Sequence, residues 1–294
     1  MYNLILFWYL FLYYHMEKII IYFETIPSLH RSLILAGGLF FFWIIEGIVP
    51  FSRIPYKKLK HAGPNLFFTV MTGVVNMGLA FALVAASDYV SASEFGVLHW
   101  LPIESTAIKV ICGLLILDLV GAYFAHWSEH KIKPLWMVHL VHHSDHHVDA
   151  TTANRHHPIE NVVRVAFTAL AILVSGASIG IIMLYQTLSA AASQFGHANI
   201  ILPKKLDQWL SYVLVTPNMH KVHHHYKQPL TDTNYGNIFS IWDRVFGTYT
   251  FVEDSKSLVY GIDTHIKDKK IDSFSNLLLI PFKKMRKKSK SKVS

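Results

Sequence analysis

Four apolar stretches constrain this chain more than any other feature of its sequence. They cover residues 32–50, 66–86, 106–125 and 162–192. About twenty apolar residues in a helix suffice to cross the hydrocarbon core of a bilayer. The chain is 52% hydrophobic and 16% charged, which is too apolar for an ordinary soluble domain. We therefore predict an all-α, polytopic membrane protein with about four membrane-embedded helices or helical hairpins.

The charges between these stretches predict the topology. Residues 53–60 carry four Lys or Arg side chains, whereas residues 87–105 carry three acidic side chains and neither Lys nor Arg. Lys and Arg accumulate on the cytoplasmic side of membrane proteins, so the third stretch should return the chain to the cytoplasm. The fourth stretch is too long for one crossing and is interrupted by Gly and Ser at residues 175–180. We expect a hairpin there, which also ends in the cytoplasm.

The two ends of the chain carry less information. Residues 1–26 lack a basic start and a small-residue cleavage site, so we expect no cleaved signal peptide, and Met16 is an alternative start. The basic run at residues 283–292 suits anionic lipid headgroups or a solvated tail. No aromatic-basic groove accompanies it, which argues against a nucleic-acid partner. The single cysteine, Cys112, excludes an intrachain disulfide.

Histidines gather in three blocks beside the third apolar stretch and before the last part of the chain. One block has the spacing H-x3-H and two have the spacing H-x2-H-H, so in helices each block would project from one face. The blocks are His126 and His130; His139, His142 and His143; and His220, His223 and His224. Taken singly, each could be a solvated polar residue. Eight imidazoles exceed the three or four that one zinc ion takes, so the count favours two metal ions.

The three blocks and their flanks resemble the eight-histidine signature of the fatty acid hydroxylase / sterol desaturase superfamily of membrane di-iron enzymes. Asp118 and Tyr123 match its D-x4-Y, and residues 149–160 are similar to its D-x-T-T-x-x-R-x-H-P-x-E run. Residues 194–199 and 234–248 resemble its F-x-H-A-N and N-[FY]-G-N segments. The likeness is strongest to the branch with bacterial sterol-desaturase-like proteins and alkylglycerol monooxygenase. It implies membrane helices at 1–105, a cytosolic histidine-rich di-iron domain at 106–250 and a C-terminal segment at 251–294.

The resemblance also implies roles for individual residues. The eight block histidines would bind two iron ions, for which zinc can substitute in a purified sample, and His197 is a candidate ninth ligand. Metal-bound imidazoles commonly donate their other N–H to a carboxylate or amide. We expect this orienting role for Asp118, Glu129 and Asn199. Asp118 lies two turns before His126 on the same face of the expected helix and could instead make a structural hydrogen bond, and Glu129 could simply be solvated. His146, His147 and His156 are expected at the surface or beside the ligands. His157 could bind metal or, next to Pro158, form a turn, and His225 could be a spare ligand or solvated.

The function that the resemblance implies is oxidation of a lipid. The enzyme would use O2 and external electrons to hydroxylate or desaturate a sterol, fatty acyl or alkylglycerol lipid that enters from the bilayer. The sequence has no cytochrome b5, flavin, NAD or iron–sulfur motif, so a separate electron donor of the cytochrome b5, ferredoxin or reductase type is implied. We expect an integral protein of a bacterial inner membrane, with its active site on the cytoplasmic face.

Two other classes of protein deserve weight. A zinc-dependent membrane hydrolase would also use histidines, but the H-E-x-x-H motif is absent and the number of imidazoles would be unexplained. A metal transporter would place its ligands at mid-membrane, in broken helices. Here nearly all histidines lie beyond the predicted spans, which favours the oxygenase.

Overall fold

The computed structural model describes residues 14–52, 56–254, 257–264 and 273–283. Within these ranges the regular structure is helical, apart from isolated bridges such as that between Leu214 and Phe239. The predicted all-α fold is therefore confirmed. Of the two chain ends considered above, residues 1–13 and 284–292 lie outside the described ranges, which removes half of the first segment and nearly all of the basic run.

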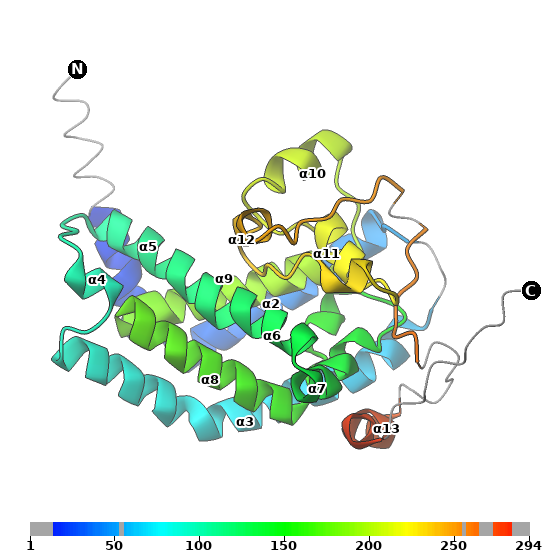
Figure 1. Cartoon of the computed structure of the whole chain (residues 1–294), viewed down its shortest axis with the longest axis horizontal. Helices are drawn as coiled ribbons and strands as arrows, with labels where there is room; N and C mark the ends of the chain where they lie inside the picture. Colours follow the sequence, from blue (N-terminus) through cyan, green and yellow to red (C-terminus); the bar gives the residue numbers. More distant parts are fainter. Residues whose placement is uncertain (1–13, 53–55, 255–256, 265–272, 284–294) are drawn as a thin grey trace, which may run out of the picture.

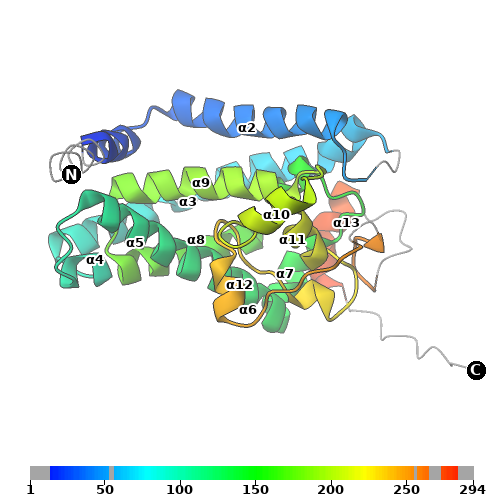
Figure 2. The same cartoon turned by 90° about the horizontal axis from the view of Figure 1, so that it is seen from above.

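Four helical segments are long and apolar enough to cross a membrane, which indicates an integral membrane protein. They are α2 (Ser28–Ile48), the segment Lys58–Trp100 that contains α3 (Lys58–Ala92), the segment Thr106–Lys131, and α8 (Pro158–Ser175). Their outward faces carry large apolar side chains such as Phe40 and Phe81, which are 61% and 70% exposed. Contiguous exposed apolar surface of this kind is unfavourable in water and suits lipid. The long helices lie side by side in Figure 1, and α2 runs along α9 in Figure 2.

The second predicted span was too short at both ends. Helix α3 begins at Lys58 instead of residue 66 and continues to Ala92, so the first part of the predicted loop at 87–105 is helical. The basic residues at the start of α3 lowered the apparent hydropathy without ending the helix, because Lys side chains can extend to the membrane surface. A short helix, α4 (Val97–Trp100), follows within the remainder of that loop.

The third span contains an irregularity that the sequence did not predict. Helix α5 (Thr106–Asp118) continues into a π-helical segment, η1 (Leu119–Phe124), and then into α6 (Ala125–Lys131). A π-helical segment changes the angle between side chains before and after it. The α-helical register that would relate Asp118 to His126 therefore does not apply.

The predicted hairpin in the fourth stretch is present. Helix α8 ends at Ser175, Gly176 adopts a left-handed φ of 71°, and α9 (Ile179–His197) leads back. Both helices pack on α5, and the apolar core lies among α3, α5, α8 and α9. The hairpin brings its two ends, near His157 and His197, to the same end of the molecule.

Short elements gather at that end. They comprise α7 (Lys133–His143), η2 (Ala150–Asn154), α10 (Lys204–Leu210), α11 (Pro217–His223), η3 (Leu230–Asp232), α12 (Ile241–Val245), α13 (Phe274–Leu279) and η5 (Ile280–Phe282). Figure 1 shows α6, α7 and α11 close together, toward the end of the long helices that lies opposite the bend between α8 and α9. This arrangement brings the three histidine blocks into one region.

Candidate metal centre

Nine buried histidines form two groups, each able to hold a metal ion. The first histidine group comprises His126, His130, His139, His143 and His223. The second histidine group comprises His142, His197, His220 and His224. Within each group, one ring nitrogen of every member lies within 4.8 Å of the others. The rings of the two groups also touch, since those of His143 and His224 stack at 4.7 Å.

Three short helices carry the histidine blocks, and two of the blocks divide their histidines between the two groups. Helix α6 supplies both members of the H-x3-H pair to the first group. Helix α7 contributes to both groups, with His142 in the second group and its other two histidines in the first. Helix α11 also contributes to both, with His223 in the first group. The repeated H-x2-H-H spacing thus lets α7 and α11 each supply histidines to both of the neighbouring groups.

The inward nitrogens are arranged as metal ligands would be. In the second group, His197 Nε2 lies 3.0 Å from Nε2 of both His142 and His220. A single ring nitrogen cannot satisfy two others with one proton, whereas a metal ion accepts all three lone pairs. In the first group, Nε2 of His126, His139 and His223 is buried without a hydrogen-bond partner among the described residues. Both groups therefore fit bound metal ions.

Outer hydrogen bonds fix the orientation of several rings. His126 Nδ1 donates to Tyr235 O over 2.9 Å, and His223 Nδ1 donates to Thr233 O over 2.7 Å. His197 Nδ1 donates to Ser193 O over 2.7 Å. Because Nδ1 carries the proton in each ring, the lone pair of Nε2 points into the group, as metal binding requires.

The closing segment at residues 234–248 holds the acceptor of His126 in place. The buried carboxylate of Asp243 accepts hydrogen bonds from the backbone N–H of Tyr235 over 2.7 Å and of Gly236 over 2.9 Å. Burial raises the pKa of Asp243 to about 6. The Asp243 carboxylate thus fixes the Tyr235 peptide, whose carbonyl accepts the hydrogen bond from His126 Nδ1.

Burial also keeps the imidazoles neutral. It lowers the pKa of His142, His143, His220 and His224 well below the usual value, and neighbouring histidines lower it further. The pKa of His223 falls to about 4, again because the ring is buried. Metals bind the neutral ring, so the nine side chains are ready for metal at neutral pH.

A buried network of two carboxylates and one guanidinium adjoins both groups. Glu160 Oε1 lies 2.8 Å from His139 Nδ1 and 2.7 Å from His156 Nδ1. Arg164 binds Glu160 over 3.1 Å and Glu129 over 2.7 Å, and Glu129 lies 3.5 Å from His139 Nδ1. The ring of His156 stacks on that of His142 at 4.6 Å. The network therefore contacts one ring of each histidine group.

Two of the three expected orienting residues contact no histidine among the described residues. The Asp118 carboxylate accepts from the backbone N–H of Phe239 and from Trp242 Nε1, each over 3.1 Å. The Asn199 side chain pairs with the backbone of Ser52 through two bonds of 3.0 Å. Both residues connect distant segments of the chain. Of the three, Glu129 lies next to a histidine of the groups, at 3.5 Å from His139 Nδ1, and its orienting role stays a prediction.

Sequence reasoning assigned no role to two residues that contact the groups. Glu160 lies four residues after His156 and begins α8 beside Pro158, which was a detectable i,i+4 signal. Asp232 Oδ1 lies 3.3 Å from His130 Nδ1, a contact across 102 residues that no local pattern indicates. Lys131 pairs with the same carboxylate at 3.0 Å.

The other histidines lie outside the two groups. His157 caps α8, accepting the N–H of Ile159, and donates to Leu278 O. This is the turn role that Pro158 suggested. His225 accepts the N–H of Val259, and His147 stacks on Tyr56 at 4.7 Å. None of these three belongs to a potential metal-binding group in the described part of the chain.

The fold and the histidine groups together define a class of protein: a helical membrane protein with two buried histidine groups that fit metal ions. Residues 110–248 match the family described as Fatty acid hydroxylase. The chain belongs to the fatty acid hydroxylase superfamily.

Several relatives have known names. Ornithine lipid hydroxylase OlsE of Rhizobium tropici is 25% identical over 211 residues, which cover 70% of this chain and 62% of that protein. Alkylglycerol monooxygenase of Danio rerio is 32% identical over 148 residues, covering 50% of this chain and 31% of that protein. The human alkylglycerol monooxygenase is 27% identical over 146 residues, with coverages of 49% and 31%. The matched region thus spans less than two thirds of each relative. No solved structure matches.

Proposed function

We propose that this protein is a membrane-bound oxidoreductase that uses O2 to hydroxylate a lipid at two iron ions held by the two histidine groups. The observation that carries the proposal is the pair of adjoining, buried groups of five and four imidazoles in a chain of this superfamily. The names of the relatives, a lipid hydroxylase and monooxygenases, favour hydroxylation over desaturation. Ornithine lipids and alkylglycerols are therefore the first substrates to test.

The bound metal ions would supply the capacity to bind and reduce O2 and so to oxidise an unactivated C–H bond. The protein side chains supply the surroundings. Buried, neutral imidazoles provide nitrogen ligands, and their outer hydrogen bonds prevent the rings from rotating. Glu160 holds the proton of His139 Nδ1 and that of His156, while Arg164 balances the charge of the two glutamates.

The alkyl chain would reach this centre from the bilayer. An apolar cleft of about 290 Å³ lies between α5, a candidate membrane span, and the segments around Tyr212 and Phe239. Its walls on α5 are Ile111, Leu114 and Leu115. A cleft of this size can take several methylene groups. Asp118 binds the backbone of Phe239 and so holds one wall against α5.

The proposal includes partners and a location. Electrons would come from a separate donor of the cytochrome b5, ferredoxin or reductase type. We propose that the histidine groups face the cytoplasm. They lie at the same end as the basic start of α3, and the positive-inside rule supports a cytoplasmic location for that end. We propose the inner membrane of a bacterium as the site of the protein.

Metal analysis of the detergent-purified protein tests this function. About two irons per chain are expected in the wild type. His223→Ala and His224→Ala should each lose iron, whereas His225→Ala, which alters the neighbouring histidine outside both groups, should retain it. Turnover of an ornithine lipid or an alkylglycerol with a reductase, ferredoxin and O2 would then be measured. One tightly held zinc and no iron after anaerobic ferrous reconstitution would overturn the proposal and favour a zinc hydrolase.

A further inference from the structure

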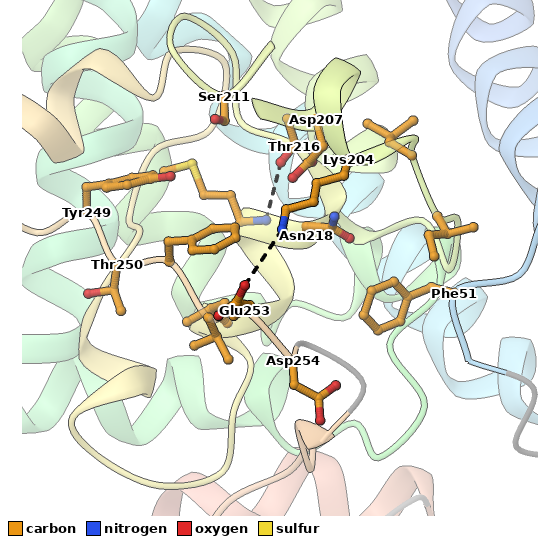
Figure 3. A pocket seen from close by; sticks show the side chains of 16 residues that line it. Phe51, Lys204, Asp207, Ser211, Thr216, Asn218, Tyr249, Thr250, Glu253 and Asp254 are labelled. Atoms are coloured by element: carbon orange, nitrogen blue, oxygen red, sulfur yellow. Dashed lines mark hydrogen bonds and ion pairs between the residues drawn. The ribbon is translucent and has the colours of Figure 1, made fainter. Parts of the chain in front are cut away.

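A second pocket lies against the back of α11. Its volume is about 360 Å³, and its walls come from α10, from α11 and from residues 249–254 (Figure 3). Asn218, Met219 and Val222 face this pocket, while His220 and His223 belong to the histidine groups. One short helix therefore separates the pocket from the metal centre, a distance of roughly 10 Å.

The pocket is acidic although the chain is basic. Three carboxylates line it, from Asp207, Glu253 and Asp254, against one ammonium, from Lys204. Three negative charges and one positive charge leave a net charge of −2, whereas the whole chain carries +8. A concave site with charge opposite to that of the rest of the protein selects a cationic ligand.

One of these carboxylates has a buried oxygen without a hydrogen-bond partner among the described residues. Asp207 is 5% exposed, lines the pocket from α10, and its Oδ1 has no hydrogen-bond partner among the described residues. Oδ1 of Asn218, which lines the pocket from α11, is also buried and has no hydrogen-bond partner among the described residues. Two unsatisfied acceptors that line one pocket favour a ligand with several N–H donors.

An ion pair inside the pocket also indicates that an ammonium group can bind there. Lys204 Nζ reaches across the pocket to Glu253 Oε1 at 3.7 Å (Figure 3). Both side chains are more than half exposed, so this ion pair is weak and a ligand can replace it. Phe251 also lines the pocket and offers an aromatic face, to which ammonium groups are attracted.

We propose that this pocket binds an ammonium group, carried by the headgroup of an amine-bearing lipid or by a small soluble amine. The headgroup source fits the surroundings, because Trp209 and Tyr212, on and just after α10, are 76% and 62% exposed. Exposed Trp and Tyr of this kind are typical of segments at the membrane surface. For a lipid substrate the inference rests on the proposed function: the headgroup would be held behind α11 while the chain reaches the metal centre.

Calorimetric titration of the metal-loaded, full-length protein in detergent tests the proposal. Octylamine carries the ammonium and a chain, octanol carries the chain alone, and ethylamine carries the ammonium alone. Octylamine should bind roughly tenfold tighter than octanol. Asp207→Asn should weaken octylamine binding by about the same factor, while Lys204→Gln, which removes the competing ammonium, should strengthen it a few fold. Asp88→Asn, at the exposed far end of α3, is the matched control and should change nothing.

The possible results distinguish a lipid headgroup from a soluble amine as the ligand, and they test the ammonium site separately from the oxidoreductase function. Ethylamine binding as tightly as octylamine would support the ammonium site and assign it to a soluble amine. Equal binding of octanol and octylamine, or unchanged affinity in both pocket variants, would overturn the site. Because the readout is binding, it is independent of turnover. Octylamine binding that persists in an iron-free His223→Ala protein would support the pocket even if the oxidoreductase proposal fails.

Discussion

Glu160 Oε1, on α8, accepts a hydrogen bond of 2.8 Å from His139 Nδ1, on α7. The same oxygen lies 2.7 Å from His156 Nδ1, and the ring of His156 stacks on His142. One carboxylate therefore supports rings of both histidine groups. It orients a ligand of the first group directly and contacts the second group through one intervening ring.

Replacing this carboxylate should weaken metal binding without unfolding the protein. In Glu160→Gln the side chain keeps its shape, but the amide no longer attracts the proton of His139 Nδ1 as a carboxylate does. We expect a loss of metal affinity of about 10- to 100-fold, measured as iron retained against increasing chelator concentration. Glu104→Gln, in an exposed loop at the other end of the molecule, is the control. Equal iron retention in wild type and Glu160→Gln would contradict the orienting role.

Asp118 should affect stability rather than metal binding. Its buried carboxylate accepts hydrogen bonds from two backbone N–H groups and from Trp242 Nε1, so in Asp118→Asn one donor would face an amide N–H₂. The expected cost is about 1–3 kcal/mol of unfolding free energy, seen as a lower Tm. Iron per folded chain should stay at the wild-type value. Iron loss at an unchanged Tm would instead support the orienting role predicted from the sequence.

The stability of the metal-free protein should fall as the pH is lowered from 7.5 to 5.5. Burial lowers the pKa of His142, His143, His220 and His224 in the folded state, whereas the same side chains titrate near 6.5 when unfolded. Below that pH the unfolded chain binds more protons than the folded chain, so acid favours unfolding. At a pH above about 6.5 the histidines are neutral in both states, so they do not lower the free energy of unfolding.

Thermal unfolding of the metal-free protein across this pH range provides the measurement. His220→Gln removes one of the four imidazoles, and its Tm should depend less steeply on pH than that of the wild type. A wild-type Tm that is constant or rises toward pH 5.5 would show that these rings are protonated in the folded state.

Local patterns predicted much of this structure. The apolar stretches predicted the membrane helices, and the Gly and Ser run at 175–180 predicted the hairpin, because both signals depend on neighbouring residues. The spacings predicted that the histidines of each block would share one face if the block were helical, and the number of imidazoles predicted two metal ions. The structure brings all nine candidate ligands together, while their binding of metal stays a prediction.

The partners of these residues could not be predicted in the same way. The π-helical segment Leu119–Phe124 changes the register between Asp118 and His126, and composition does not indicate where such a segment occurs. The contact between His130 and Asp232 joins residues 102 apart in the sequence. Contacts of this kind depend on how whole helices pack, which a single sequence does not specify.

Gly176 is a position where a single methyl group should destabilise the fold far from the metal centre. Its φ of 71° is strained for other residues, and a Cβ there would lie 2.5 Å from Phe95 O. We expect Gly176→Ala to lose about 1–3 kcal/mol and to lower the Tm, with normal iron content in the folded fraction. Its effect can be compared with that of a second glycine substitution, within a helix.

Gly78→Ala is the matched control, because its Cβ would meet no atom within 4 Å inside α3. Since alanine has a higher helix propensity than glycine, the Gly78→Ala variant should be at least as stable as the wild type. Equal Tm values for the two variants would show that the bend between α8 and α9 tolerates a side chain, and that the close approach of residues 95–96 to Gly176 does not fix the hairpin.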